Sequence, residues 1–183
     1  TRDQIATLTS SFGDLDQITD VIIVDTGAGI NESILEFVTS SSEVLLVVTP
    51  EPTSITDAYA LLKTLDGNDE FNEKNTIIKV ITNRVSSKND GKELFHKLNA
   101  VVQKFLDIQL EYLGAIPQDN NVSKAVILQT PFSLVYPASS SSRAIRELAY
   151  TLYHNEVPNK TGQNKGMSRF FANLIEKARQ RQP

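Results

Sequence analysis

The hydrophobic residues of this chain gather in short uninterrupted runs, and longer amphipathic segments separate the runs. Three runs predict buried strands at Val21–Val24, Val44–Val48 and Ile77–Ile81, and a weaker run covers Tyr112–Ile116. The first two runs are rich in valine or isoleucine and do not alternate with polar residues. Such runs are typical of parallel strands that are covered on both faces.

The segments between the runs carry apolar residues at helical spacing. Helices are predicted at 31–39, with Asn31 as the N-cap, and at 53–65, 91–106, 121–128 and 139–153. A further helix around Ile5–Leu15 precedes the first strand. Strands that alternate with helices indicate an α/β fold of three layers, in which a mostly parallel sheet has helices on both faces. Ligands of such folds bind beyond the carboxyl ends of the strands.

The composition is that of an ordinary globular protein, and it excludes sites that depend on cysteine. With 183 residues the chain is long enough for one domain. It has no cysteine, which excludes disulfides and thiolate metal sites. The two histidines, His96 and His154, lack a metal-ligand spacing and are expected on the surface. No apolar run approaches the roughly 20 residues that span a bilayer.

The character of the chain changes after Tyr153. Residues 155–166 contain a proline, two glycines and few apolar side chains, which predicts a flexible linker between a domain at 1–154 and a helix at 167–181. Residues 165–183 carry five bases and one acid, whereas the whole chain has a net charge of −4. The body is therefore acidic, and we do not expect it to bind nucleic acid.

The predicted C-terminal helix has one apolar stripe with basic residues beside it. The stripe consists of Met167, Phe170, Phe171, Leu174 and Ile175. A short basic amphipathic helix behind a linker is typical of an anchor on an anionic membrane surface. The alternative is a helix that docks on its own domain, and the linker argues against a permanent dock.

The strongest candidate for chemistry is the turn after the first strand. Asp25 ends the strand, and Thr26, Gly27 and Gly29 follow it. A carboxylate at a strand end can hold Mg²⁺, often through water, and glycines let backbone N–H groups approach a terminal phosphate. The alternative is an ordinary capped turn. A dinucleotide fingerprint is excluded, because Glu32 stands where a third small residue is needed.

Two more polar clusters follow later strands. Asn83 and Arg84 come after the third, and the asparagine amide can offer both a donor and an acceptor to a purine edge. Pro117, Gln118 and Asp119 come after the fourth, where the proline can pack on a flat base and the aspartate can cap the next helix. Each cluster taken alone is better explained as an ordinary turn or a helix cap.

Taken together, the segments VIIVDTGAGI, VTPEPTSITDAYALLKTL, ITNRV, GAIPQDNNVSKAV and TPFSLVYPASSSSRAIRELA occur in an order that resembles MinD and ParA-like ATPases. The DTGAG form and the TPEPTSITDAYA segment are most similar to the flagellar number regulator FlhG, also called FleN. The resemblance covers roughly residues 1–155 and implies a P-loop NTPase fold of the SIMIBI type.

The resemblance also implies roles for the candidate residues. Asp25 matches the aspartate that positions Mg²⁺, and Thr26 to Gly29 match the switch that senses the terminal phosphate of ATP. Asn83 and Arg84 match the pair that contacts the base, and Pro117 to Asp119 match the loop that closes over adenine. Family members form homodimers when ATP is bound, and MinD and FlhG carry a C-terminal membrane-targeting helix.

The chain departs from the family in one respect, because it contains no glycine-rich phosphate loop with two lysines and no first switch. The fold is therefore expected without its N-terminal strands, and this chain alone is not expected to hydrolyse ATP well. The implied whole protein is a peripheral ATPase on the inner face of a bacterial cell membrane. Its implied partners are the FlhF GTPase and flagellar basal-body components.

Two other functions remain open at this stage. The first is MinD-like positioning of a division site or another cargo. The second is a regulatory scaffold that binds no nucleotide but keeps the sheet and the tail.

Overall fold

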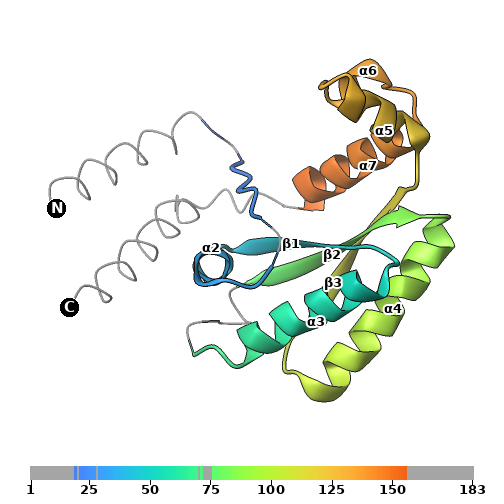
Figure 1. Cartoon of the computed structure of the whole chain (residues 1–183). Coiled ribbons are helices and arrows are strands. Elements are labelled where there is room, and N and C mark those ends of the chain that lie inside the picture. Colours follow the sequence, from blue (N-terminus) through green and yellow to red (C-terminus); the bar gives the residue numbers. More distant parts are fainter. Residues whose placement is uncertain (1–18, 20, 28, 70, 72–75, 156–183) are drawn as a thin grey trace, which may run out of the picture.

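A computed structural model of the chain describes residues 19, 21–27, 29–69, 71 and 76–155. The described elements in chain order are α2 (Glu32–Ser40), β1 (Glu43–Val48), α3 (Pro52–Asp66), β2 (Ile77–Val85), α4 (Lys88–Phe105), β3 (Leu110–Pro117), α5 (Asn120–Ile127), α6 (Phe132–Val135) and α7 (Ser140–Asn155) (Figure 1). The described strands are parallel and pair in the order β1-β2-β3. This confirms the predicted α/β class and the parallel sheet.

Helices cover both faces of this sheet. α3 and α4 lie on one face, and α7 packs against β3 on the other (Figure 1). Two consecutive residues of β3 show the division, because Gly114 faces Leu148 of α7 while Ala115 lies next to Gly91 of α4. A register shift between β2 and β3 skips Leu113, so Tyr112 and Ala115 both reach α4.

The core lies between the sheet and the α3–α4 layer. Its most buried members, each at most 2% exposed, are Val48, Leu62, Leu65, Ile78, Val80, Val85, Leu98 and Val102. Val48, Ile78 and Val80 occupy alternate strand positions on one face of the sheet, and the helix residues recur at helical spacing. The apolar periodicity of 53–65 and 91–106 therefore predicted the covering helices correctly.

Two boundaries and one short helix differ from the sequence prediction for local reasons. α4 begins at Lys88 rather than Gly91, because the Ser87 hydroxyl accepts the Asp90 amide hydrogen at 3.1 Å and caps the helix earlier. β2 continues to Val85 and includes the polar pair that was expected to follow it. α6 was not predicted, since four residues are too few for a periodic pattern.

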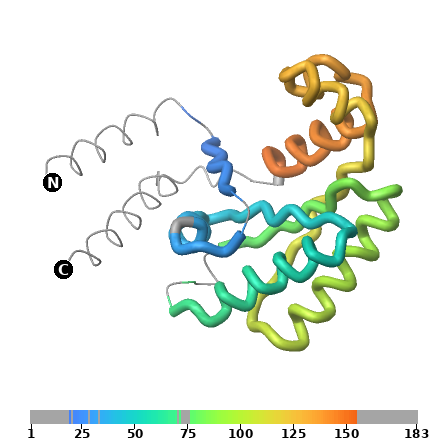
Figure 2. Tube along the Cα trace, in the orientation of Figure 1, coloured from blue at the N-terminus to red at the C-terminus, as the bar shows by residue number. Residues whose placement is uncertain are grey.

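The prediction of a buried strand at Val21–Val24 is wrong for this structure. These residues form no described strand and are 42–81% exposed, and residues 21–27 run outside the sheet (Figure 2). A continuous apolar run becomes a central strand only when strands flank it and helices cover it. Here the outer edge of β1 has no strand partner among the described residues, and Leu45 and Val47 on one face of β1 are also exposed.

Three predicted segments fall outside this description. They are the helix around Ile5–Leu15, the C-terminal helix at 167–181, and all of the linker except Asn155, which ends α7. Among the described residues, no helix is both long and apolar enough to cross a membrane.

Candidate functional site

Arg84, near the end of β2, joins the loops that follow β1 and β3. Its Nη1 lies 3.0 Å from Oε1 of Glu51, which precedes α3, and its Nε donates to Oε1 of Gln118 at 3.3 Å. The carboxyl ends of parallel strands meet at one edge of the sheet, and ligands of α/β folds bind there. The structure therefore brings Arg84 and Gln118 together, and both had been predicted as site residues.

Asn83 supports the backbone that carries Arg84. Arg84 has φ +57°, a left-handed conformation that costs a non-glycine residue roughly 1–2 kcal/mol. The Asn83 side-chain oxygen accepts the Arg84 amide hydrogen at 2.9 Å and helps to hold this conformation. The Asn83 oxygen therefore has an intramolecular partner, and the side-chain amide supplies the remaining hydrogen-bonding capacity of this half-buried residue.

Glu51 belongs to this site, although the sequence analysis did not single it out. A hydrogen bond from the Thr49 side chain lowers the pKa of its carboxyl group, as do its own backbone N–H and the charge of Arg84. Glu51 therefore stays ionised opposite the guanidinium. One sequence signal could have found it: Pro52 is the first residue of α3, and proline favours that position, so Glu51 must lie in the loop at the strand ends.

Asp119 holds the third loop. Its carboxylate accepts the amide hydrogen of Asn121 at 2.9 Å and thereby caps α5, as the sequence predicted. It also accepts from the amide of Ser141 at 3.1 Å and the hydroxyl of Ser140 at 2.8 Å. The backbone bonds from Asn121 and Ser141 are the largest causes that lower its pKa to about 2.

Pro117 also lines a cavity of about 190 Å³ between α4 and α7. Lys88 of α4 and Glu147 of α7 are among its other lining residues, and Lys88 Nζ lies 2.7 Å from Glu147 Oε2. The hydrogen bond from Lys88 and its charge lower the pKa of the Glu147 carboxyl group. The ion pair therefore connects the two helices beside the β3–α5 loop.

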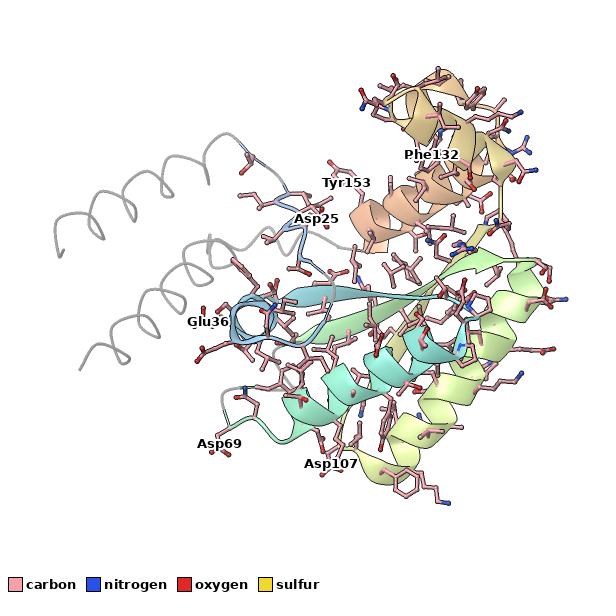
Figure 3. All side chains as sticks on the ribbon, in the orientation of Figure 1. Asp25, Glu36, Asp69, Asp107, Phe132 and Tyr153 are labelled. Carbon is pink, nitrogen blue, oxygen red and sulfur yellow. The ribbon has the colours of Figure 1, made fainter. Side chains whose placement is uncertain are left out.

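The predicted metal residues are not brought to this edge. Asp25, Thr26, Gly27 and Gly29 are exposed, and Figure 3 shows Asp25 well away from the ends of the strands that carry Arg84 and Gln118. Gly29 has φ +105°, which fits the conformational freedom that the sequence analysis assigned to this turn. No group of three His, Cys, Asp or Glu side chains that could hold a metal occurs within the described residues.

The predicted base contact and the predicted metal site differ in how far the described residues come together. Asn83, Arg84, Pro117 and Gln118 place an amide, a guanidinium, an apolar pyrrolidine ring and a second amide around the strand ends, and their contact with a base stays a prediction. Asp25, the predicted Mg²⁺ residue, is exposed and lies away from these groups. A role for Asp25 in metal binding stays a prediction.

Comparison with known proteins places this geometry in a family. The antiactivator FleN of Pseudomonas aeruginosa is 44% identical over 146 residues, which are 80% of this chain and 51% of that protein. The flagellum site-determining protein YlxH of Helicobacter pylori is 30% identical over 165 residues, which are 86% of this chain and 52% of that protein.

A solved structure agrees with the fold. The cell division ATPase MinD of Pyrococcus furiosus superposes with a TM-score of 0.58 at 20% identity, over 82% of this chain and 59% of that one. The chain belongs to the MinD/ParA family. No protein-family model matches it, and it spans about half the length of the curated relatives it matches. Homologues in this family are ATPases or ATP-binding proteins.

Proposed function

We propose that this chain is part of a MinD-like ATPase that regulates the number or placement of flagella. The observation that carries the proposal is the 44% identity to FleN, whose similarity extends over 80% of the chain and so includes the strand-end loops. The similarity to YlxH, a flagellum site-determining protein, supports the same process. Within that process the chain would supply the base-binding side of the nucleotide site.

The proposed base contact uses the loops after β2 and β3. The Asn83 side-chain amide and the backbone of Pro117 and Gln118 would recognise the edge of adenine, and the proline ring would pack on its face. Arg84 would keep the loops together through its bonds to Glu51 and Gln118. This arrangement binds and orients the nucleotide but performs no bond-breaking step.

The phosphate end would rely on the turn after Val24. Asp25 would hold Mg²⁺ through water, and the backbone of Thr26 to Gly29 would respond to the terminal phosphate. Mg²⁺ supplies charge neutralisation to phosphoryl transfer. In the described structure this turn is exposed and away from Arg84, so this role requires the turn to move to the strand ends.

The proposed output is membrane-associated dimerisation. ATP would favour a homodimer, and two copies of the tail stripe (Met167, Phe170, Phe171, Leu174 and Ile175) would then bind an anionic membrane together. One short amphipathic helix binds marginally, so dimerisation would set the membrane affinity. The acidic body disfavours DNA as the surface on which the dimer acts.

Nucleotide titration tests the proposal. The product of the complete gene should bind ATP with Mg²⁺ in calorimetry and hydrolyse it, and GTP should bind more weakly. The 183-residue chain alone should bind weakly or not at all, because it contains no lysine-bearing phosphate loop. Asn83→Ala should weaken affinity, whereas Asp25→Ala should abolish turnover.

The titration also separates the proposal from its alternative. A complete gene product that binds no nucleotide would identify a regulatory scaffold instead. Turnover within a few-fold of wild type in Asp25→Ala would refute the metal assignment. Low-micromolar binding by the 183-residue chain would show that it contains another phosphate site.

A further inference from the structure

One carboxylate connects the proposed base loop to the helix that leads out of the domain. Asp119 Oδ1 accepts from the amide of Asn121 in α5, and Oδ2 accepts from the amide of Ser141 and the hydroxyl of Ser140 in α7. α5 follows immediately, but α7 begins 21 residues later. The same side chain therefore caps one local and one distant helix.

Ser141 of α7 also binds the loop directly. Its hydroxyl donates to the carbonyl oxygen of Pro117 at 2.9 Å, and the residue is completely buried. Pro117 and Asp119 are thus both bound to Ser141, one through its hydroxyl and the other through its amide. The backbone between them is closed into a ring by hydrogen bonds.

Gln118 lies between Pro117 and Asp119, and its hydrogen bonds go to β2 instead of α7. Its amide donates to the carbonyl oxygen of Val85 at 2.9 Å, and its side chain accepts from Arg84. The three-residue loop is therefore held on one side by β2 and on the other by α7. If the contact with α7 were lost, the loop would keep its contact with β2 and the Asp119 cap of α5 but would lose its support from the α7 side.

The negative charge of Asp119 is favourable at the N-termini of α5 and α7. An anion is favourable at a helix N-terminus, where N–H groups lack partners, and Asp119 stands at two of them. Each of its two oxygens accepts at least one hydrogen bond from the chain. These three bonds tie the carboxylate to the first turns of α5 and α7.

We infer that Asp119 is a positioning residue that acts on the base contact through Pro117 and Gln118, by fixing their loop to the first turn of α7. The inference rests on the proposed function for the identity of the ligand. It changes the role that the sequence suggested, because Asp119 was expected among the residues that contact the nucleotide. It also means that a ligand that orders the loop orders the start of α7.

Two substitutions at Asp119 separate its two caps. Asp119→Asn keeps an oxygen for the Asn121 amide, and asparagine is as good an N-cap as aspartate. It presents an NH₂ group to the Ser141 amide, which can only donate, so that bond to α7 is lost, while the bond from the Ser141 hydroxyl to Pro117 is kept. Asp119→Ala removes both caps. Asn31→Ala is the matched control, because it removes the N-cap of α2, where Asn31 Oδ1 accepts the Ile34 amide at 3.0 Å, without touching the loop.

The first measurement is steady-state ATP hydrolysis and ADP–Mg²⁺ calorimetry with the complete gene product. Asp119→Asn and Asp119→Ala should both raise KM and the ADP dissociation constant by about tenfold while kcat stays within about threefold, because a base contact contributes equally to ground and transition states. Asn31→Ala should leave both constants unchanged. Unchanged constants in Asp119→Asn, or an equal loss in Asn31→Ala, would overturn the inference.

The second measurement needs no nucleotide and so stands apart from the proposed function. Amide hydrogen exchange of the 183-residue chain should show faster exchange at Ser141 and at Gln118 together in Asp119→Asn, with Asn121 still protected. Faster exchange at Ser141 alone would show that α7 does not hold the loop and would overturn the inference. If the wild type binds no nucleotide but Gln118 and Ser141 respond together, the proposed ligand is wrong and the positioning role is retained.

Discussion

Gly91 of α4 lies so close to Thr82 of β2 that a β-carbon on Gly91 would stand 2.6 Å from the threonine hydroxyl oxygen. The same β-carbon would meet Ala115 and Tyr112 of β3 at 2.9 Å. Glycine is unfavourable inside a helix, so its presence in the first turns of α4 is explained by this close approach of helix and sheet.

Gly91→Ala should therefore destabilise the domain although alanine is the better helix former. Propensity would contribute up to about 1 kcal/mol in favour of alanine, but overpacking costs about 1–3 kcal/mol, and the neighbours here are two strands. Gly67→Ala is the control, since its β-carbon would meet only a carbonyl oxygen at an ordinary 3.7 Å and its φ is −86°. Urea unfolding should give a lower midpoint for Gly91→Ala and an unchanged or higher one for Gly67→Ala.

Acid should remove the stabilisation that Asp119 provides. Its pKa is lowered from 3.8 to about 2, so the stabilisation is complete above pH 4 and is lost as the pH falls towards 2. The difference in free energy of unfolding between wild type and Asp119→Asn should be constant from pH 7 to about pH 4.5 and shrink below pH 4. A difference that does not change down to pH 2.5 would contradict the predicted ionisation.

Removing one partner of the Lys79–Glu43 ion pair should lower the stability of the domain more than replacing both partners with apolar residues. Lys79 is 8% exposed in the middle strand, and its Nζ lies 2.5 Å from Glu43 Oε1 on the neighbouring strand. Glu43→Leu leaves a buried charge unpaired and should cost about 3–5 kcal/mol, whereas Glu43→Leu with Lys79→Met should restore most of that loss. Thermal unfolding of the two single variants and the double variant checks this. Additive losses would show that the charges act independently.

The 183-residue chain should self-associate. The outer edge of β1 has no strand partner among the described residues, and Leu45, Val47 and Val21–Val24 are exposed apolar residues. Val47→Lys should reduce association, because a charge on an exposed strand blocks sheet-to-sheet contact, while Lys63→Arg on the opposite layer should have no effect. Sedimentation velocity over a concentration series is the measurement, and a monodisperse wild-type monomer would refute the prediction.

The tail should bind anionic vesicles through its apolar stripe. Phe170→Glu/Phe171→Glu should abolish co-sedimentation, and added salt should weaken it, because each basic side chain near an anionic surface contributes about 1 kcal/mol. Neutral vesicles and Lys160→Ala, in the predicted linker, are the controls. Equal binding of wild type and double variant would show that the stripe does not enter the membrane.

Periodicity predicted most of the fold because most elements bury one regular face. The apolar spacing of 53–65 and 91–106 located α3 and α4, and continuous apolar runs located β1 and β2. Val21–Val24 failed because its structure depends on neighbours outside the segment, which a local pattern cannot report. Arg84 and Gln118 were found because both lie near the ends of strands. Pro52 could have placed Glu51 in the neighbouring loop, but its contact with Arg84 depends on a left-handed residue that no pattern reveals.

The capped start of α7 has a mechanical consequence. A helix of 16 residues is a rod of about 24 Å, and its first turn is fixed to the β3–α5 loop by Asp119 and Ser141. If the rod pivots by about 10° at the capped end, its far end at Asn155 travels about 4 Å. The residues that follow Asn155 are therefore attached to the long arm of a lever whose fulcrum is the proposed base loop.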